Sequence, residues 1–260
     1  MISFHTEGEV KEFSRMLELP PIKINSAQYE MLPLCEMGIS ISFSKFMALE
    51  QRMWVAAQNL VKAFKTDHKG LCNSETDYSE SFWERTMYIE NAIISYNACL
   101  DYIYIILYFY YDFYRESEIP IKRAKDIDRI SEGFELEQKK RLTQTLRKDS
   151  QTKKMIEDIE IYRKSSQKLR NNANNLKHRA GFWVCGFDYP RNTKVTKVIN
   201  GAEVDITMIL TPKSHDLEKE IKYLVGIHNQ LIRLVLELFY LLNYPRKIEQ
   251  FLQFNGLNAD

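Results

Sequence analysis

Chain breakers are scarce in this sequence of 260 residues, which has 9 glycines and 7 prolines against 15 tyrosines and 14 phenylalanines. This balance excludes a loop-rich or low-complexity chain and favours long regular elements packed around a core. The net charge is also small, at +1, so no global electrostatic field points to nucleic acid or to an anionic membrane. Any case for a charged partner must therefore rest on a local cluster.

Cysteine is scarce as well, and its copies are far apart in the sequence. The four cysteines are Cys35, Cys72, Cys99 and Cys185. They form no C-x-x-C pair and have no histidine at zinc-ligand spacing, which excludes a locally encoded zinc site or disulfide framework. We therefore predict reduced, mostly buried thiols, with no metal and no cofactor. The sequence also lacks a glycine-rich phosphate loop, an H-E-x-x-H pair and a G-x-S-x-G turn, so the common cofactor-binding and hydrolase classes lose support.

No uncharged stretch is long enough to cross a membrane. The most apolar one, residues 102–111, is bracketed by Asp101 and Asp112, whereas a transmembrane helix needs about twenty apolar residues. We interpret it as part of a central helix packed on every face, with an aromatic interface between subunits as the alternative. The N-terminus lacks the cationic start and apolar run of a signal peptide, so we predict a cytoplasmic protein with no membrane partner.

Apolar residues recur at helical spacing over most of the chain. Long helices are predicted over 43–64, 77–114, 151–179 and from Ser214 or Asp216 to Leu242, with one or two short helices around Gly133. In the segment 151–179, apolar residues spaced alternately by four and three form a seam from Met155 to Leu176. Such a seam is typical of a helix that packs along one edge.

The period changes from helical to extended after Gly181. Residues 182–187, 194–199 and 203–210 resemble strands, with Asn200-Gly201 as a type I′ turn between the last two. We therefore predict a mainly α fold, an up-and-down helical bundle with a small three-stranded antiparallel β-sheet inserted before the last long helix. The expected domains are an N-terminal arm at 1–40, the bundle at 41–245 with its β insertion at 182–210, and a C-terminal tail at 246–260.

One polar cluster, at the end of the helix predicted over 151–179, is a candidate functional site. It reads Arg170-Asn-Asn-Ala-Asn-Asn-Leu-Lys-His-Arg179 and places basic and amide side chains beside the apolar seam. At about 100° per residue, Arg170, Asn174 and Lys177 share one stripe, and His178 follows Asn174 by one turn. These groups face a cleft, a second subunit or water. The alternative is that they only bond the hairpin and the C-terminal end of their own helix.

The cluster closes a basic segment. Residues 139–179 carry roughly +9 within a chain whose overall net charge is only +1. Such a segment can hold a polyanion, and the alternative is a solvated helix face balanced by acidic groups elsewhere on the surface. His215 beside Asp216 is interpreted as part of a helix cap rather than as a catalytic dyad, since no nucleophile is marked in the sequence.

Three features together resemble the HEPN superfamily of helical bundles. They are Ser95-Tyr-Asn-Ala-Cys-Leu-Asp-Tyr102 in a long helix, a later helix closing in Arg170-Asn171 and Lys177-His178-Arg179, and a final apolar helix. In many such proteins an arginine and a histidine a few residues later form a metal-independent ribonuclease site at a dimer interface. The resemblance implies RNA or a nucleotide as partner, a homodimer, Arg170 and His178 as the catalytic pair, and binding roles for Asn171, Asn174, Lys177 and Arg179.

In the implied reaction His178 exchanges protons with the attacking 2′-hydroxyl or the leaving oxygen, while Arg170 and Lys177 offset charge on the phosphorane. The spacing departs from the family pattern, because seven residues lie between Arg170 and His178. On a straight helix eight steps separate the two Cα atoms by about 12 Å, so catalysis requires an early helix end or a second subunit. The alternative function is a non-catalytic helical module that dimerises or binds a partner.

Overall fold

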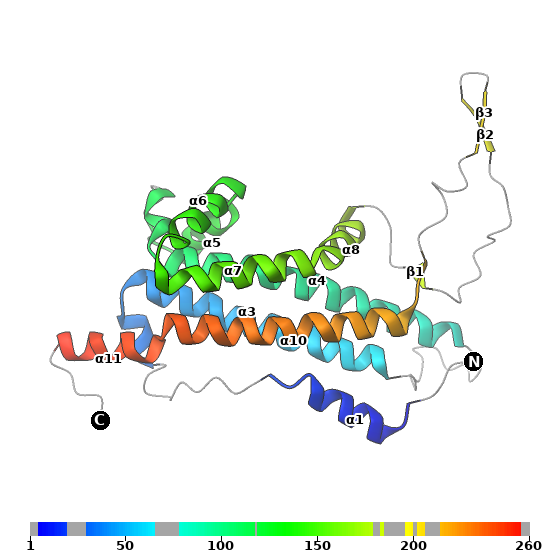
Figure 1. The fold of residues 1–260 in the computed structure, drawn as a ribbon, viewed down its shortest axis with the longest axis horizontal. Coiled ribbons are helices and arrows are strands. Elements are labelled where there is room, and N and C mark those ends of the chain that lie inside the picture. Colours follow the sequence, from blue (N-terminus) through cyan, green and yellow to red (C-terminus); the bar gives the residue numbers. More distant parts are fainter. Residues whose placement is uncertain are drawn as a thin grey trace. The chain divides into compact units, whose positions relative to one another are not determined.

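The structure, a computed structural model, describes residues 5–19, 30–65, 78–117, 119–178, 183–184, 196–199, 202–205 and 214–255, some of them by their backbone alone. These residues are mainly helical, as predicted (Figure 1). The chain divides into two compact units. Unit 1 comprises residues 1–18, 55–94 and 168–227, and unit 2 comprises residues 19–54, 95–167 and 228–260. Each unit therefore gathers segments that are distant in sequence.

The helices follow the periods of the sequence. The long ones are α3 (Met37–Phe64), α4 (Tyr78–Tyr110) and α10 (Leu217–Leu242), and the shorter ones are α1 (Glu7–Met16), α5 (Ala124–Glu132), α6 (Leu136–Leu146), α7 (Ser150–Ser165), α8 (Gln167–His178) and α11 (Tyr244–Phe254). Two 3-10 helices are also present. η1 (Leu32–Leu34) precedes α3, and η2 (Phe113–Ser117) follows α4. The helix predicted over 77–114 ends early, just before Asp112 takes a left-handed conformation with φ of 60°.

The predicted three-stranded antiparallel sheet is wrong. Among the described strands, β2 (Thr196–Ile199) and β3 (Ala202–Asp205) form an antiparallel pair, with Ile199 opposite Ala202. β1 (Trp183–Val184) instead pairs in parallel with β4 (Ser214–His215), directly before α10, and no described strand has more than one partner. A short extended pattern marks a strand, but it does not specify the partner of that strand, which depends on contacts distant in sequence.

Aromatic rings fill the core of unit 2 around Tyr244, the first residue of α11. Tyr244 is fully buried, its ring lies edge-on to Phe43 and Phe46 of α3 at 5.1 and 6.0 Å between centroids, and its hydroxyl donates to Ser42 at 3.2 Å. Asn243 has φ of 44°, a conformation that Asn tolerates and that turns the chain from α10 into α11. Most of the apolar stretch at 102–111 is buried too, in agreement with a packed central helix.

A buried arginine joins three helices in unit 1. Arg85 of α4 is 3% exposed, and its Nε donates to the Ala63 carbonyl in the last turn of α3 at 2.7 Å. Its Nη2 lies 2.5 Å from the carboxylate of Glu218 in the first turn of α10. The last carbonyls of a helix lack intrahelical partners, and an acidic residue suits the positive N-terminal end of a helix. One side chain therefore satisfies the ends of two helices.

The N-terminal arm predicted at 1–40 contains a helix that belongs to unit 1. α1 begins with a capping box, in which the Glu9 amide donates to the Thr6 hydroxyl at 3.3 Å and the Thr6 amide donates to the Glu9 carboxylate at 2.6 Å. Its Phe13 ring stacks on Phe64 at the end of α3, with 4.0 Å between centroids. α1 is thus held by the same kind of aromatic packing as the long helices.

Two stretches, Trp83–Tyr110 and Leu217–Phe254, are long and apolar enough to cross a membrane by length and composition alone. This is weak evidence, because the core helices of globular proteins pass the same test. In the first stretch, 67% of the apolar window is buried inside the protein. By that measure it is a core helix.

Candidate functional site

The segment predicted as one helix over 151–179 is two helices. Figure 1 shows the break between α7 and α8, which falls at Ser166, where the backbone has φ of −87° and ψ of 13°. The Ser165 hydroxyl donates to the Tyr162 carbonyl at 3.0 Å, and the Ser166 hydroxyl donates to the Arg163 carbonyl at 3.4 Å. Serine hydroxyls compete in this way for the backbone groups that a continuous helix would use. The seam nevertheless continues, because Ser166 is itself buried.

α8 keeps its apolar edge and Asn172 inward and most of its other polar residues outward. Leu169 and Ala173 are buried, and Arg170 is half-buried beside them. Beyond its first turn, the exposed side of the helix carries three amides and one cation. We name this set the α8 ridge, and its members are Asn171, Asn174, Asn175 and Lys177. Five of the residues predicted for the site thus lie on one short helix: Arg170, Asn171, Asn174, Lys177 and His178.

The first turn of α8 is anchored to α10 by two polar contacts. Lys168 Nζ lies 2.6 Å from Glu220 Oε1 and 4.6 Å from the centre of the Tyr223 ring. The Leu169 amide donates to the Tyr223 hydroxyl at 3.0 Å, so Tyr223 satisfies one of the first amides of α8, which lack intrahelical partners. These contacts fix the start of the helix that carries the ridge.

Glu220 is the centre of this anchor. Its side chain is 5% exposed, and Oε1 also lies 3.2 Å from His215 Nδ1. Oε2 is buried and has no hydrogen-bond partner among the described residues. Burial by itself would raise the pKa of Glu220, but hydrogen bonds from His215 and Lys168 outweigh burial and lower the pKa below its ordinary value. The carboxylate is therefore charged at neutral pH and helps to hold the fold together.

The Glu220→Gln variant is expected to lose about 1 kcal/mol of unfolding free energy at neutral pH, because a charged acceptor is replaced by a neutral one. The pKa of Glu220 is lower in the folded protein than its ordinary value of 4.5, so its stabilisation is present above that value and is lost as the pH falls through the folded pKa. Urea unfolding at about pH 7 and about pH 3 measures the difference. The control is the exposed Glu157→Gln variant, whose unfolding free energy should equal that of wild type. If Glu220→Gln loses the same unfolding free energy at both pH values, the assignment is contradicted.

The proposed catalytic pair is not brought together by one copy of α8. The helix runs without a break from Gln167 to His178, so Arg170 and His178 are separated by eight steps, or about 12 Å along its axis. The backbone of His178 is described but its side chain is not, and Arg179 lies outside the described residues. A reaction that uses both side chains therefore requires a second subunit.

His215 and Asp216 act separately. Asp216 Oδ1 accepts a hydrogen bond from the Lys219 amide at 3.2 Å, as a residue that caps the start of a helix does. His215 contacts Glu220 instead. The interpretation of Asp216 as a helix cap is confirmed, but the anchor of Lys168, His215, Glu220 and Tyr223 was missed. Its signal in the sequence is Glu220 itself, a charged residue among the core positions Leu217, Ile221 and Leu224 of α10.

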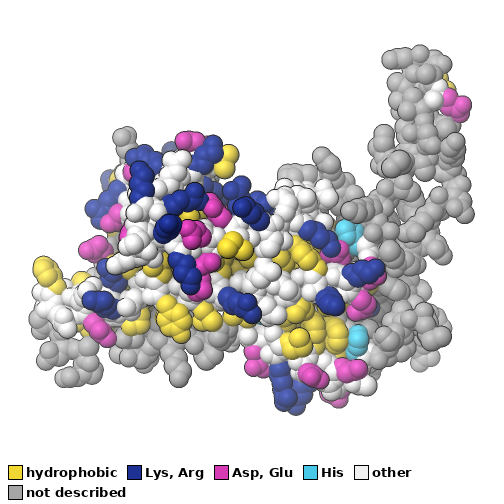
Figure 2. Space-filling model, viewed as in Figure 1, with side chains coloured by type: hydrophobic (Ala, Val, Ile, Leu, Met, Phe, Trp, Pro, Cys, Tyr) yellow, Lys and Arg dark blue, Asp and Glu magenta, His cyan; other side chains and the backbone are white. Residues whose placement is uncertain are grey.

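Six of the basic side chains in the segment 139–179 form ion pairs. Figure 2 shows Lys and Arg side chains lying among Asp and Glu side chains over α5, α6 and α7. The pairs that involve this segment are Lys139–Asp101, Lys140–Glu137, Arg141–Glu116, Arg147–Glu160, Lys154–Glu237 and Lys168–Glu220. This pattern supports the solvated helix face rather than a continuous polyanion-binding surface. In the described part of the chain, Lys177 of the ridge has no ion pair.

The described residues contain no group of three or more His, Cys, Asp or Glu side chains able to hold a metal ion. Cys35 and Cys99 are buried thiols, and burial raises the pKa of both, which keeps them protonated. Comparison of the chain with protein-family models, with curated proteins and with solved structures finds no match in any of the three.

Proposed function

We propose that the chain is a HEPN-like helical protein that binds single-stranded RNA through the α8 ridge. The observation that carries the proposal is that amides and a cation are exposed on one side of a helix whose other side is buried and whose first turn is anchored. Amide side chains hydrogen-bond to base edges, and a lysine contacts phosphate without sequence preference. Unstacked single strands present both groups to a protein surface.

Cleavage is the narrower form of the same proposal. Two copies of the chain would supply Arg170 from one subunit and His178 from the other, because one copy of α8 separates them by about 12 Å. In such a dimer the histidine moves the proton and the arginine offsets phosphorane charge. If wild type and His178→Ala degrade RNA equally, or if neither does, the cleavage proposal fails and only the binding proposal remains.

The Lys177→Glu variant is expected to weaken RNA binding about tenfold at low salt and to reduce the salt dependence by about one ion, because a phosphate contact is lost. Asn174→Ala is expected to weaken binding less and to leave the salt dependence unchanged. Fluorescence anisotropy with a labelled, unstructured RNA at several salt concentrations measures both quantities.

Lys153→Glu is the matched control, since Lys153 is an exposed lysine of α7 with no ion pair in the described part of the chain. It makes the same change in net charge outside the ridge and should retain most of the affinity. Equal losses in Lys153→Glu and Lys177→Glu would mean that only overall charge matters, and the ridge would then have no specific role.

An exposed apolar stripe on α4 favours a second function, that of a non-catalytic module which binds a protein partner. Trp83, Met87 and Ile94 are 54%, 47% and 39% exposed, and their spacing places them on one face of the helix. Tryptophan and methionine are enriched at protein interfaces. This second function is preferred if wild type and the ridge variants bind RNA equally weakly.

A further inference from the structure

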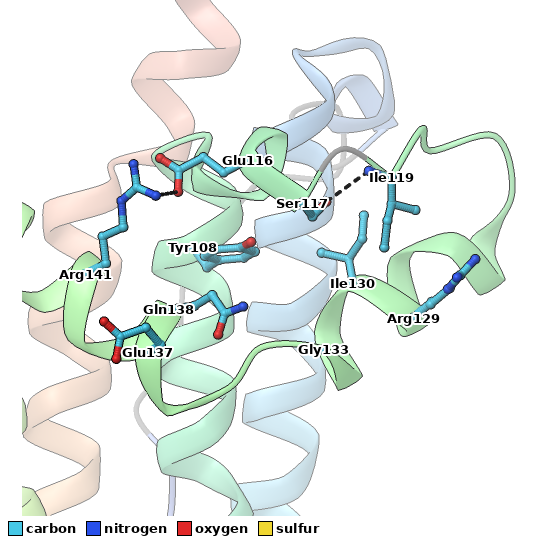
Figure 3. Close-up of a pocket in the computed structure, with 10 residues that line it drawn as sticks. All are labelled: Tyr108, Glu116, Ser117, Ile119, Arg129, Ile130, Gly133, Glu137, Gln138 and Arg141. Atoms are coloured by element: carbon cyan, nitrogen blue, oxygen red, sulfur yellow. Dashed lines mark hydrogen bonds and ion pairs between the residues drawn. The ribbon is translucent and has the colours of Figure 1, made fainter.

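A pocket in unit 2, separate from α8, has the lining of a small-molecule site. It has a volume of about 360 Å³ and is lined by residues of α4, η2, α5 and α6 and by Gly133 and Ile119. Cavities of this size hold small organic ligands. In Figure 3 the Arg141 and Glu116 side chains lie at one end, Ile119 and Ile130 lie at the other, and Tyr108 and Gln138 lie between them.

The middle of the pocket offers hydrogen-bond donors. The Gln138 carbonyl oxygen is engaged, because it accepts from the Glu135 amide at 3.0 Å in the capping box of α6. This contact fixes the orientation of the amide and leaves its NH₂ group to face elsewhere. Tyr108 is 5% exposed, and its ring is held against Phe134 at 4.6 Å between centroids. Burial, reinforced by Glu116, raises the pKa of Tyr108 against the opposing effect of Arg141, so its hydroxyl stays protonated and able to donate.

The charged end of the pocket already holds a carboxylate. Arg141 Nη1 lies 3.0 Å from Glu116 Oε2, and the two side chains are 65% and 42% exposed. An ion pair this exposed contributes little to stability, since water competes for both groups. Glu116 lies on a five-residue 3-10 helix, so its side chain can turn into solvent without disturbing a long element. A carboxylate from outside can therefore replace Glu116 on the Arg141 guanidinium.

We propose that this pocket binds a small monocarboxylate with an apolar body, whose carboxylate accepts from Arg141 and Gln138 while the body packs against Ile119 and Ile130. The Glu116 carboxylate occupies the same position on Arg141 when no ligand is bound and competes with the ligand. Arg141 and Gln138 favour a carboxylate over a neutral group, because an arginine forms a stronger hydrogen bond with an ionised oxygen than with a neutral one. Contact with Ile119 and Ile130 selects against short acids such as propionate, and Arg129 also lines this end of the pocket.

The test uses 3-phenylpropionate as the probe, with 3-phenylpropionamide as its neutral analogue and propionate as the analogue without an apolar body. NMR titration of the full chain follows the Gln138 side-chain amide and gives a Kd for each compound. We expect 3-phenylpropionate to bind at least about tenfold more tightly than either analogue. An unchanged Gln138 resonance at saturating probe, or equal affinity for the amide, overturns the proposal.

The variants have opposite expected effects. Arg141→Gln should weaken 3-phenylpropionate binding at least about tenfold, and Gln138→Glu should do the same while keeping the capping acceptor of α6. Glu116→Gln should tighten binding about fivefold, because the internal competitor loses its charge. Lys148→Gln removes one positive charge from an exposed position, as Arg141→Gln does, and should have no effect on binding. Weaker binding by Glu116→Gln would mean that Glu116 is part of the site and not its competitor.

Discussion

Replacement of Gly38 by alanine is expected to destabilise the protein by about 1–3 kcal/mol, the range for added volume in a packed region. Gly38 is the second residue of α3, and a Cβ at this position would lie 2.6 Å from the Phe109 carbonyl oxygen and 2.8 Å from Asp112 Oδ1. A Cβ does not approach a backbone oxygen so closely, so either α3 or the end of α4 must shift. Urea denaturation followed by circular dichroism measures the loss.

The matched control is Gly226→Ala in the interior of α10, where a Cβ meets no atom within 4 Å. This variant is expected to gain about 0.5–1 kcal/mol, because alanine loses less conformational entropy than glycine in a helix. The same chemical change should therefore have opposite signs at the two positions. Stabilisation by Gly38→Ala would show that α3 does not approach Phe109 as closely as described.

The Arg85→Met variant is expected to lose about 2–3 kcal/mol of unfolding free energy. Methionine approximates the length of the arginine side chain but removes the hydrogen bond to the Ala63 carbonyl and the ion pair with Glu218. Hydrogen bonds to charged groups contribute about 1.5–3 kcal/mol, and a carbonyl left without its donor in a buried place adds a desolvation cost. Thermal and urea unfolding of the purified variant both measure the change.

Glu218→Gln separates the two contacts of Arg85. The Glu218 side chain is 57% exposed, so water replaces much of the lost interaction and the expected cost is at most about 1 kcal/mol. The hydrogen bond from Arg85 to Ala63 remains in this variant. If Glu218→Gln costs as much as Arg85→Met, the ion pair dominates and the helix-end hydrogen bond contributes little.

Helices could be predicted from the sequence because their period is local. The apolar residues of α3, α4 and α10 recur every three or four positions, and Asp216 marks the start of α10 by capping it. The break at Ser166 could not be predicted in this way, because serine at a seam position interrupts neither the spacing nor the burial. The partner of β1 was equally inaccessible, since β1 pairs with Ser214–His215 and not with its neighbours in sequence, whereas the local pair of β2 and β3 was predicted.

The exposed residues of the candidate site could be predicted from the sequence, but the contacts on its buried side could not. Helical spacing alone places Asn174 and Lys177 together, and both are exposed. The contacts of Lys168 and Leu169 with α10 join residues more than fifty positions apart, which no local pattern records. The excess positive charge of 139–179 was read correctly from composition, but composition does not show that acids such as Asp101 and Glu237 lie beside its lysines.

The discontinuity of the two units constrains the order of events during protein synthesis. Arg85 meets Glu218 only after 133 further residues have been added, and each unit takes part of its core from α10. Domains that are continuous in sequence fold one after another as the ribosome releases them. Here a nascent chain that stops before residue 217 carries two unfinished cores, and the apolar surfaces that α10 covers stay uncovered until this last long helix is added.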